Sequence, residues 1–192
     1  ILPNSSNPLE NAAADPDVAL MLRVREDDAF AFEMLVDRHQ SKIQRFMQGW
    51  VSNVQQSEDL AQDVFLRVYK ARKTYVPTAK FTTWLYRIAM NEVSRAHREG
   101  SIRKTLATLL GREMQEASSD PGPERRAQAS EAAHVLEEIL GRMKPKKRSV
   151  FVLYELEELS TEEIANVLGC GAETVKSRLR HARAEFDRLH KQ

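Results

Sequence analysis

Apolar side chains recur every three or four residues along most of this chain, which is the spacing of amphipathic helices. In the first hundred residues the pattern predicts four helices: two within residues 15–47, a third over Ser57–Lys73 and a fourth over Phe81–Glu99. The serine that opens the third range is expected to cap its helix. Thr74–Lys80 contains a proline and is expected to be a loop.

A second set of helices follows a stretch rich in helix breakers. Ser118–Pro123 reads SSDPGP, so residues 100–122 are predicted to form a flexible linker that contains at most a weak helix. Beyond it, the apolar spacing predicts helices over Pro123–Arg142 and Lys146–Glu157, followed by a helix-turn-helix over 160–190.

Composition supports an all-α fold divided into two small domains. Hydrophobic residues make up 42% of the chain and charged residues 30%, while glycine and proline are scarce at seven each, which favours long helices. We predict a disordered N-terminus over 1–14, a four-helix domain over 15–99 and a helix-turn-helix domain over 123–192, with the linker between them.

The last thirty residues are the most informative part of the sequence. Ser160 and Glu163 have the spacing of a capping box, Gly169 and Gly171 bracket a turn, and Val175 is an apolar anchor of the next helix. This layout is typical of a helix-turn-helix that places its second helix in the major groove of DNA. An ordinary helical hairpin with a solvated basic face is the alternative.

Net charge is only +1, but positive charge is concentrated on that second helix. The side chains expected to face base edges and phosphates there are Thr174, Lys176, Ser177, Arg178, Arg180, His181 and Arg183.

The predicted helix over Phe81–Glu99 has a polar stripe beside its apolar one. An aromatic, an amide and three guanidiniums in one line suit a nucleic-acid track, because they can stack on a base, contact its edge and hold phosphates. A half-buried tryptophan next to a solvated basic face explains the same pattern. The stripe consists of Trp84, Arg87, Asn91, Arg95 and Arg98.

The predicted third helix presents Asp59, Gln62, Asp63 and Leu66 on the face opposite its apolar stripe. Acids near its start and bases near its end are what the helix dipole favours, so the charges need no functional reason. The leucine among them is not explained in this way and is a weak sign of a protein contact.

The sequence offers no sign of catalysis or of metal and cofactor binding. Cys170 is the only cysteine, which excludes an internal disulfide and suits the cytoplasm, and it is expected to be a small buried turn residue. No histidine lies at metal-ligand spacing from it, and we find no catalytic constellation. Residues 1–15 lack the features of a secretory signal. We expect a cytoplasmic protein that is not an enzyme and has no small-molecule substrate.

Four motifs resemble bacterial group IV sigma factors, the extracytoplasmic-function (ECF) subunits that direct RNA polymerase to promoters. They read DLAQDVFLRVYKA, FTTWLYRIAMNEV, LYELEELSTEEIANVLG and TVKSRLRHAR, at Asp59–Ala71, Phe81–Val93, Leu153–Gly169 and Thr174–Arg183. Their order and spacing match the family over about residues 17–99 and 124–190.

The resemblance implies a role for each surface. The first domain resembles region 2, in which Asp59, Gln62, Asp63 and Leu66 would bind the β′ clamp helices of core RNA polymerase. Lys80 and the stripe from Trp84 to Arg98 would engage and melt the −10 element. The second domain resembles region 4, which reads the −35 element, and its helix over 142–154 would face the β flap. Such factors are commonly held inactive by an anti-sigma protein, often at the membrane.

One position departs from the family pattern. The recognition motif usually ends in Arg-Ala-Arg, whereas this chain has His181-Ala182-Arg183, and histidine cannot form the bidentate guanidinium contact to guanine. The −35 sequence is therefore expected to differ, unless Arg180 substitutes. A stand-alone helix-turn-helix regulator with a helical effector or dimerisation domain is the second hypothesis, and an interaction adaptor the third.

Overall fold

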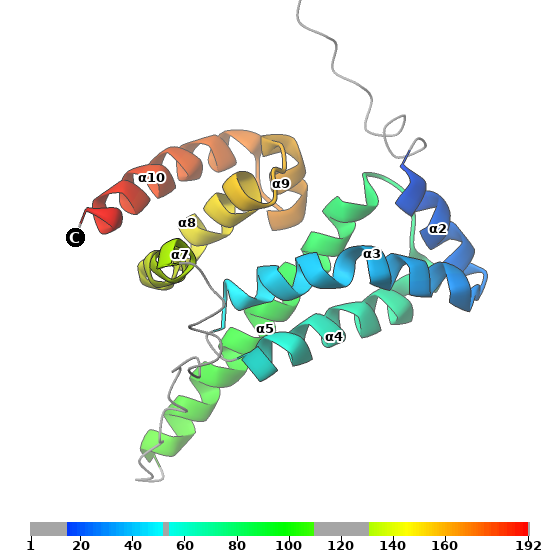
Figure 1. Cartoon of the computed structure of the whole chain (residues 1–192), viewed down its shortest axis with the longest axis horizontal. Coiled ribbons are helices and arrows are strands. Elements are labelled where there is room, and N and C mark those ends of the chain that lie inside the picture. Colours follow the sequence, from blue (N-terminus) through cyan, green and yellow to red (C-terminus); the bar gives the residue numbers. More distant parts are fainter. Residues whose placement is uncertain (1–14, 52–53, 110–130, 192) are drawn as a thin grey trace, which may run out of the picture.

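The computed structural model describes residues 15–51, 54–109 and 131–191, with side chains at all of these except 101–109 and 131–134. Its first unit comprises four helices and a short 3₁₀ turn, η1. In chain order these are α2 (Pro16–Arg25), α3 (Ala29–Gln48), α4 (Val54–Ala71), η1 (Arg72–Thr74) and α5 (Phe81–Leu109). Helices α3 and α4 run antiparallel, and α5 crosses behind them in the view of Figure 1. The described residues contain no strand, and the prediction of an all-α fold is confirmed.

A single carboxylate positions the start of the first unit. Asp15 caps α2 by accepting a hydrogen bond from the backbone N–H of Asp17 at 2.9 Å, and its other oxygen accepts from the backbone N–H of Phe81 at 2.9 Å. One side chain therefore satisfies the otherwise unpaired N–H groups of two helices. Phe81 itself is fully buried, so the start of α5 is held at both its backbone and its side chain.

Two predicted helix limits in this unit are wrong. Ser57 does not cap α4, which begins at Val54; the serine lies inside the helix, buried, and its hydroxyl donates to the carbonyl of Val54 at 2.6 Å. The fourth helix continues past Glu99 to Leu109, through Gly100. A glycine inside a helix costs only about 1 kcal/mol relative to alanine, which the good helix formers that follow it can offset.

The second unit packs four helices and a π-helical turn, η2. They are α7 (Glu131–Arg142), α8 (Pro145–Phe151), η2 (Val152–Leu156), α9 (Thr161–Leu168) and α10 (Ala172–His190). Helix α10 packs against α7, α8 and α9, with the rings of Phe151 and Phe186 stacked at 4.7 Å. The part of the first helix predicted over residues 123–130 lies outside the described residues.

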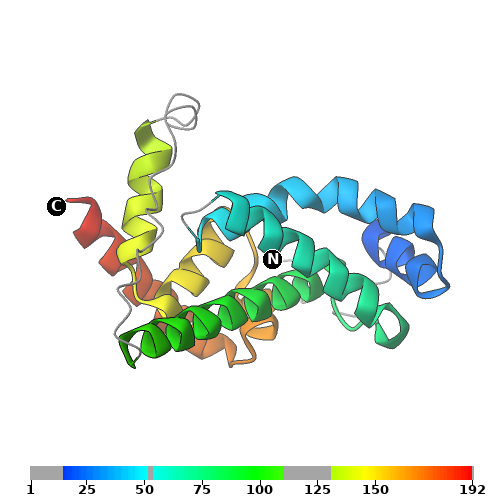
Figure 2. The same cartoon turned by 90° about the horizontal axis from the view of Figure 1, so that it is seen from below.

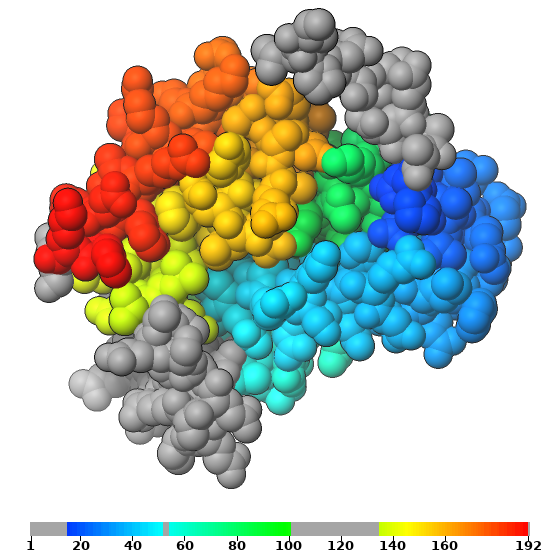
Figure 3. Space-filling model, turned by 45° about the horizontal axis from the view of Figure 1, so that its top comes forward, coloured from blue at the N-terminus to red at the C-terminus, as the bar shows by residue number. Residues whose placement is uncertain are grey.

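The two units lie against each other. Helix α9 packs along α5 (Figure 2), and the second unit rests on α3 and α5 in the space-filling view (Figure 3). Of the predicted linker, residues 100–109 belong to α5, while 110–122 lie outside the described residues, as do 1–14.

Candidate nucleic-acid and polymerase interfaces

The turn before α10 has the predicted construction. The hydroxyl of Ser160 accepts from the backbone N–H of Glu163 at 3.2 Å, and the Glu163 carboxylate accepts from the backbone N–H of Ser160 at 2.9 Å. Gly169 ends α9 at φ 62°, a left-handed conformation that glycine adopts without strain. Gly171 is the extended N-cap of α10. The predicted capping box and glycine turn are confirmed.

Burial on one side of α10 fixes which side faces solvent. Val175, Leu179 and Ala182 are buried against the rest of the unit, so the opposite side is outward. Among the residues expected to contact DNA, Arg178 is only half-buried and donates to the sulfur of Cys170 at 3.7 Å. The other six are exposed: Thr174, Lys176, Ser177, Arg180, His181 and Arg183.

Two of the exposed basic side chains on α10 already form ion pairs with acidic residues. Lys176 lies 2.7 Å from the carboxylate of Glu173, whose hydrogen bond raises the pKa of the lysine. Arg183 lies 2.6 Å from the Glu155 carboxylate, which raises the pKa of the arginine in the same way. Arg180 makes no hydrogen bond or ion pair with any described residue. To bind a phosphate, Lys176 and Arg183 must therefore leave an acidic partner, whereas Arg180 need not.

The Trp84 stripe on α5 is partly anchored and partly open. Trp84 is half-buried, with its ring edge-on to Tyr75 at 4.8 Å and tilted against Phe81 at 6.0 Å. Arg87 and Asn91 are exposed, as is Arg98 further along the helix. Trp84 is thus held in place by core aromatics while remaining within reach of the surface.

A cavity of about 220 Å³ opens beside Trp84, and Asn166 of α9 forms part of its wall. Tyr75 and Thr83 line it, and the hydroxyl of each is buried without a hydrogen-bond partner among the described residues. Burial, aided by the charge of Asp15, raises the pKa of Tyr75 to about 12, so its hydroxyl stays protonated at neutral pH. The sequence analysis missed both hydroxyls.

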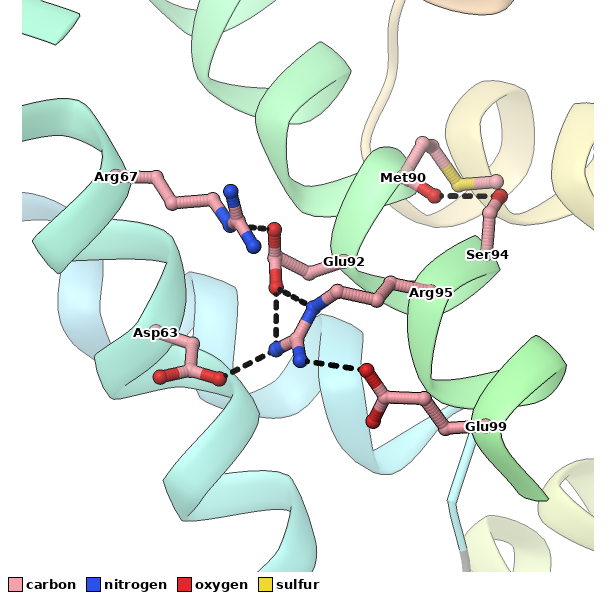
Figure 4. A network of polar contacts seen from close by, with 7 residues as sticks. All are labelled: Asp63, Arg67, Met90, Glu92, Ser94, Arg95 and Glu99. Atoms are coloured by element: carbon pink, nitrogen blue, oxygen red, sulfur yellow. Dashed lines mark hydrogen bonds and ion pairs between the residues drawn. The ribbon is translucent and has the colours of Figure 1, made fainter. Parts of the chain in front are cut away.

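Arg95 does not extend freely to solvent with the rest of the stripe. Figure 4 shows its guanidinium between α5 and α4, where it pairs with Asp63 at 2.6 Å, Glu92 at 2.7 Å and Glu99 at 2.9 Å. Glu92 is 1% exposed and also pairs with Arg67 of α4. The hydrogen bond to Glu92, with a smaller contribution from Glu99, raises the pKa of Arg95 above its usual value. This network brings together Arg95 and Asp63, which were expected to serve different partners.

The other α4 residues that were expected to bind polymerase, besides Asp63, lie beside an open groove between α3 and α4. Gln62 and Leu66 form part of a cavity of about 500 Å³ that is also lined by Phe32 and Val36 of α3. Leu66 is 55% exposed, and Asp59 is exposed and accepts a hydrogen bond from Gln55, on the preceding turn of α4. The contribution of α3 was not predicted, because its apolar spacing was assigned wholly to the core.

The side-chain contacts between the described parts of the two units include two polar pairs and one cation–π contact. Lys80, at the start of α5, lies 2.9 Å from the Glu163 carboxylate of α9. The Tyr86 hydroxyl donates to Glu157, and the Arg148 guanidinium lies 4.7 Å from the centre of the Trp50 ring. Burial lowers the pKa of Arg148 to about 10. Polar and aromatic groups of both units are therefore enclosed at this boundary.

No helix in the described part of the chain combines the length and apolar character needed to span a bilayer. Within the same residues, no cluster of three or more His, Cys, Asp or Glu side chains could hold a metal ion.

Comparison with known proteins follows the same division into two units. Residues 35–101 match the family model of sigma-70 region 2, and residues 133–186 match that of sigma-70 region 4. The chain is 32% identical to the RNA polymerase sigma-H factor of Pseudomonas aeruginosa over 180 residues, 91% of this chain and 93% of that protein. It is 31% identical to the ECF RNA polymerase sigma factor SigW of Bacillus subtilis, over 84% of this chain and 89% of that protein.

A solved structure has the same fold. The sigma factor RpoE, in complex with the anti-sigma factor NepR from Bartonella quintana, aligns with a TM-score of 0.69 at 21% identity, over 83% of this chain and 96% of that chain. The region 2 match does not favour a stand-alone helix-turn-helix regulator. The chain belongs to the sigma-70 family of RNA polymerase sigma factors, in its extracytoplasmic-function group.

Proposed function

We propose that this chain binds core RNA polymerase and directs it to promoters, with α10 reading the −35 element and the Trp84 side of α5 opening the −10 element. The observation that carries this proposal is the cavity beside Trp84, with two unpartnered buried hydroxyls, on the same chain as an exposed recognition helix. A regulator that reads only duplex DNA needs the helix but not the cavity. The chain contributes binding in the cytoplasm, and the polymerase performs the chemistry.

At the −10 element, the cavity would receive a base that has left the stack. Extruding a base costs a few kcal/mol, and a buried hydroxyl without a partner costs about 1–3 kcal/mol. A base edge that pairs with Tyr75 and Thr83 would recover part of both costs. Exposed Arg87 and Asn91 lie on the same helix, where they can hold the displaced strand. Lys80 and Arg98 extend this positive surface.

At the −35 element, the exposed side of α10 would lie in the major groove. Thr174, Ser177 and His181 follow one edge of that side, while Lys176 and Arg180 follow the other. The first edge carries short polar groups suited to base edges, and the second carries charges suited to phosphate.

For the polymerase, the groove between α3 and α4 is the proposed docking surface. Leu66 and Gln62 line it together with two apolar side chains of α3, and a protein contact at this groove would explain why Leu66 is exposed. Asp59 lies on the same helix, one turn before Gln62. Asp63 would contribute indirectly, because its carboxylate is held by Arg95. The polymerase β flap would contact the α8–η2 region, as the family resemblance implies.

Promoter binding would require the two units to separate. Elements about 25 base pairs apart lie roughly 85 Å apart along B-DNA, at about 3.4 Å per base pair. In this structure α9 lies on α5, and Asn166 reaches the cavity that would receive the −10 base. The closed arrangement therefore leaves α10 exposed but restricts the −10 surface. We propose that polymerase binding favours the separated units and that an anti-sigma protein, the kind of partner bound to RpoE in its complex with NepR, favours the closed arrangement.

Transcription with purified components tests the proposal. The chain is added to core polymerase on fragmented genomic DNA, and the 5′ ends of the transcripts are sequenced. We expect start sites that share two sequence elements near −35 and −10 and that vanish without the chain. A stable homodimer that binds DNA and does not associate with core polymerase would refute the proposal.

A further inference from the structure

His181 is fixed in one tautomer by the helix that carries it. Its Nδ1 lies 2.8 Å from the backbone carbonyl oxygen of Ser177, one turn earlier in α10. A carbonyl oxygen can only accept a hydrogen bond, so Nδ1 must be the protonated nitrogen of the ring. In the neutral imidazole the other nitrogen, Nε2, then carries a lone pair and acts only as an acceptor.

The Nε2 atom is free to face a ligand. His181 is exposed, on the same edge of α10 as Thr174 and Ser177 and away from the buried side at Val175. Within the described residues, the ring makes no hydrogen bond other than the one to Ser177. Unlike the hydroxyls of Thr174 and Ser177 on the same edge, which can donate or accept, the neutral His181 ring therefore presents an outward atom that only accepts.

We propose that His181 selects, at one position of the −35 element, a base that offers an exocyclic amino group; this inference rests on the proposed function of α10. In the major groove, only adenine N6 and cytosine N4 are hydrogen-bond donors, whereas guanine presents N7 and O6 and thymine presents O4, all acceptors. An acceptor on the protein pairs with the first two and repels the last two. An arginine at this place would have the opposite preference, for guanine.

Holoenzyme selection from a promoter library tests this assignment. Core polymerase with the wild-type chain, or with His181→Arg or His181→Ala, transcribes a library whose −35 element is randomised. For the wild type we expect one position enriched in adenine or cytosine. His181→Ala should remove that enrichment, roughly 5- to 150-fold for one base contact, and keep the other positions, and His181→Arg should move it to guanine. Because His181 is exposed, unchanged thermal melting of each variant serves as the folding control.

A base analogue isolates the hydrogen bond. At the selected position, adenine is replaced by purine, or cytosine by pyrimidin-2-one, each of which lacks the amino group. The wild type should lose initiation by a similar factor, while His181→Ala should not respond to the replacement. Selection of guanine or thymine by the wild type, or an unchanged preference in His181→Arg, would overturn the assignment. Absence of any −35 preference in the wild type would instead overturn the proposed function.

Discussion

Lys80 and Glu163 form an ion pair of 2.9 Å between the start of α5 and the first turn of α9. The same carboxylate closes the capping box with Ser160, so the start of the helix-turn-helix is bonded to the edge of the proposed −10 surface. Burial alone would raise the pKa of Glu163, but the hydrogen bonds from the Ser160 backbone and from Lys80 outweigh it and lower the pKa. The closed arrangement is therefore held partly by ionised groups.

Removing one hydroxyl at this boundary should favour separation of the units. Tyr86→Phe keeps the ring, which packs edge-on against Phe46, and loses the hydrogen bond to Glu157. A hydrogen bond to a charged group is worth about 1.5–3 kcal/mol, so the open fraction should rise roughly 10-fold or more. Energy transfer between dyes placed on the two units measures the change. Tyr69→Phe, an exposed hydroxyl outside the boundary, is the matched control, and equal transfer in both variants would contradict the prediction.

Acidification should close the units, because of Glu157. Burial raises the pKa of this carboxyl above its usual 4.5, although the Tyr86 hydroxyl, Arg45 and Lys42 act in the opposite direction. An acid whose pKa is higher in the closed state binds more protons there, so closure is favoured as the pH falls through the raised pKa toward 4.5.

The same energy-transfer measurement, titrated from pH 7 to 5, should therefore show increasing closure, and Glu157→Gln should abolish that change. The lowered pKa of Glu163 acts in the opposite direction, favouring opening, and does so mainly below pH 4.5. An identical pH response in Glu157→Gln would show that another group is responsible.

The Glu92 carboxylate should be the most sensitive polar group of the first unit. It is 1% exposed and pairs with both Arg67 and Arg95, so Glu92→Ala leaves two guanidiniums without their buried partner. The two guanidiniums are 50% and 35% exposed, so the expected cost is that of hydrogen bonds to a charged group, about 1.5–3 kcal/mol, which chemical denaturation would detect. Glu99→Gln removes an exposed partner of the same arginine and should cost at most about 1 kcal/mol. Similar losses in the two variants would contradict a special role for burial.

Sequence reasoning succeeded for most features that depend on neighbours along the chain, although Ser57 lies inside α4 and does not cap it. The Ser160 capping box, the Gly169 turn and the exposed side of α10 follow from local spacing, and each lies where it was predicted. It failed where distant segments meet. The Tyr86 hydroxyl donates to Glu157 of the second unit, and spacing within the helix, which places its ring beside the buried stripe, does not specify that partner.

Side-chain orientation was also beyond the sequence. Arg95 shares a helix face with Arg87 and Asn91, yet its guanidinium turns toward α4, where it pairs with Asp63 of that helix and with the buried Glu92 of α5. Thr83 lies across α5 from the buried stripe that includes Leu85, so its burial beside the Trp84 cavity depends on a loop that has no regular pattern.

On α10, a basic side chain that is paired with an acid should contribute less to DNA binding than one that has no acidic partner. Lys176 must leave Glu173 to reach a phosphate, whereas Arg180 has no such partner among the described residues. We expect Arg180→Ala to weaken holoenzyme binding to the −35 duplex more than Lys176→Ala and to reduce the slope of affinity against salt by about one. Glu173→Gln should strengthen binding, because it frees Lys176. Fluorescence anisotropy at several salt concentrations checks all three, and weaker binding by Glu173→Gln would contradict the model of competing partners.

The Thr83 hydroxyl should lower the stability of the chain and assist promoter opening. It is 3% exposed and has no hydrogen-bond partner among the described residues, so replacing it by the methyl group of Thr83→Val should raise the free energy of unfolding by about 1 kcal/mol or more. The same change removes a polar group that the proposed −10 base would use, so open-complex formation should fall while binding of the chain to core polymerase is unchanged.

Thr82→Val, at the adjacent half-buried position that lines a different cavity, is the matched control. Thermal melting and permanganate footprinting of the −10 region measure the two effects. A variant that is more stable and opens promoters normally would show that the cavity does not receive the base, because an unpaired hydroxyl retained without a ligand carries only a cost.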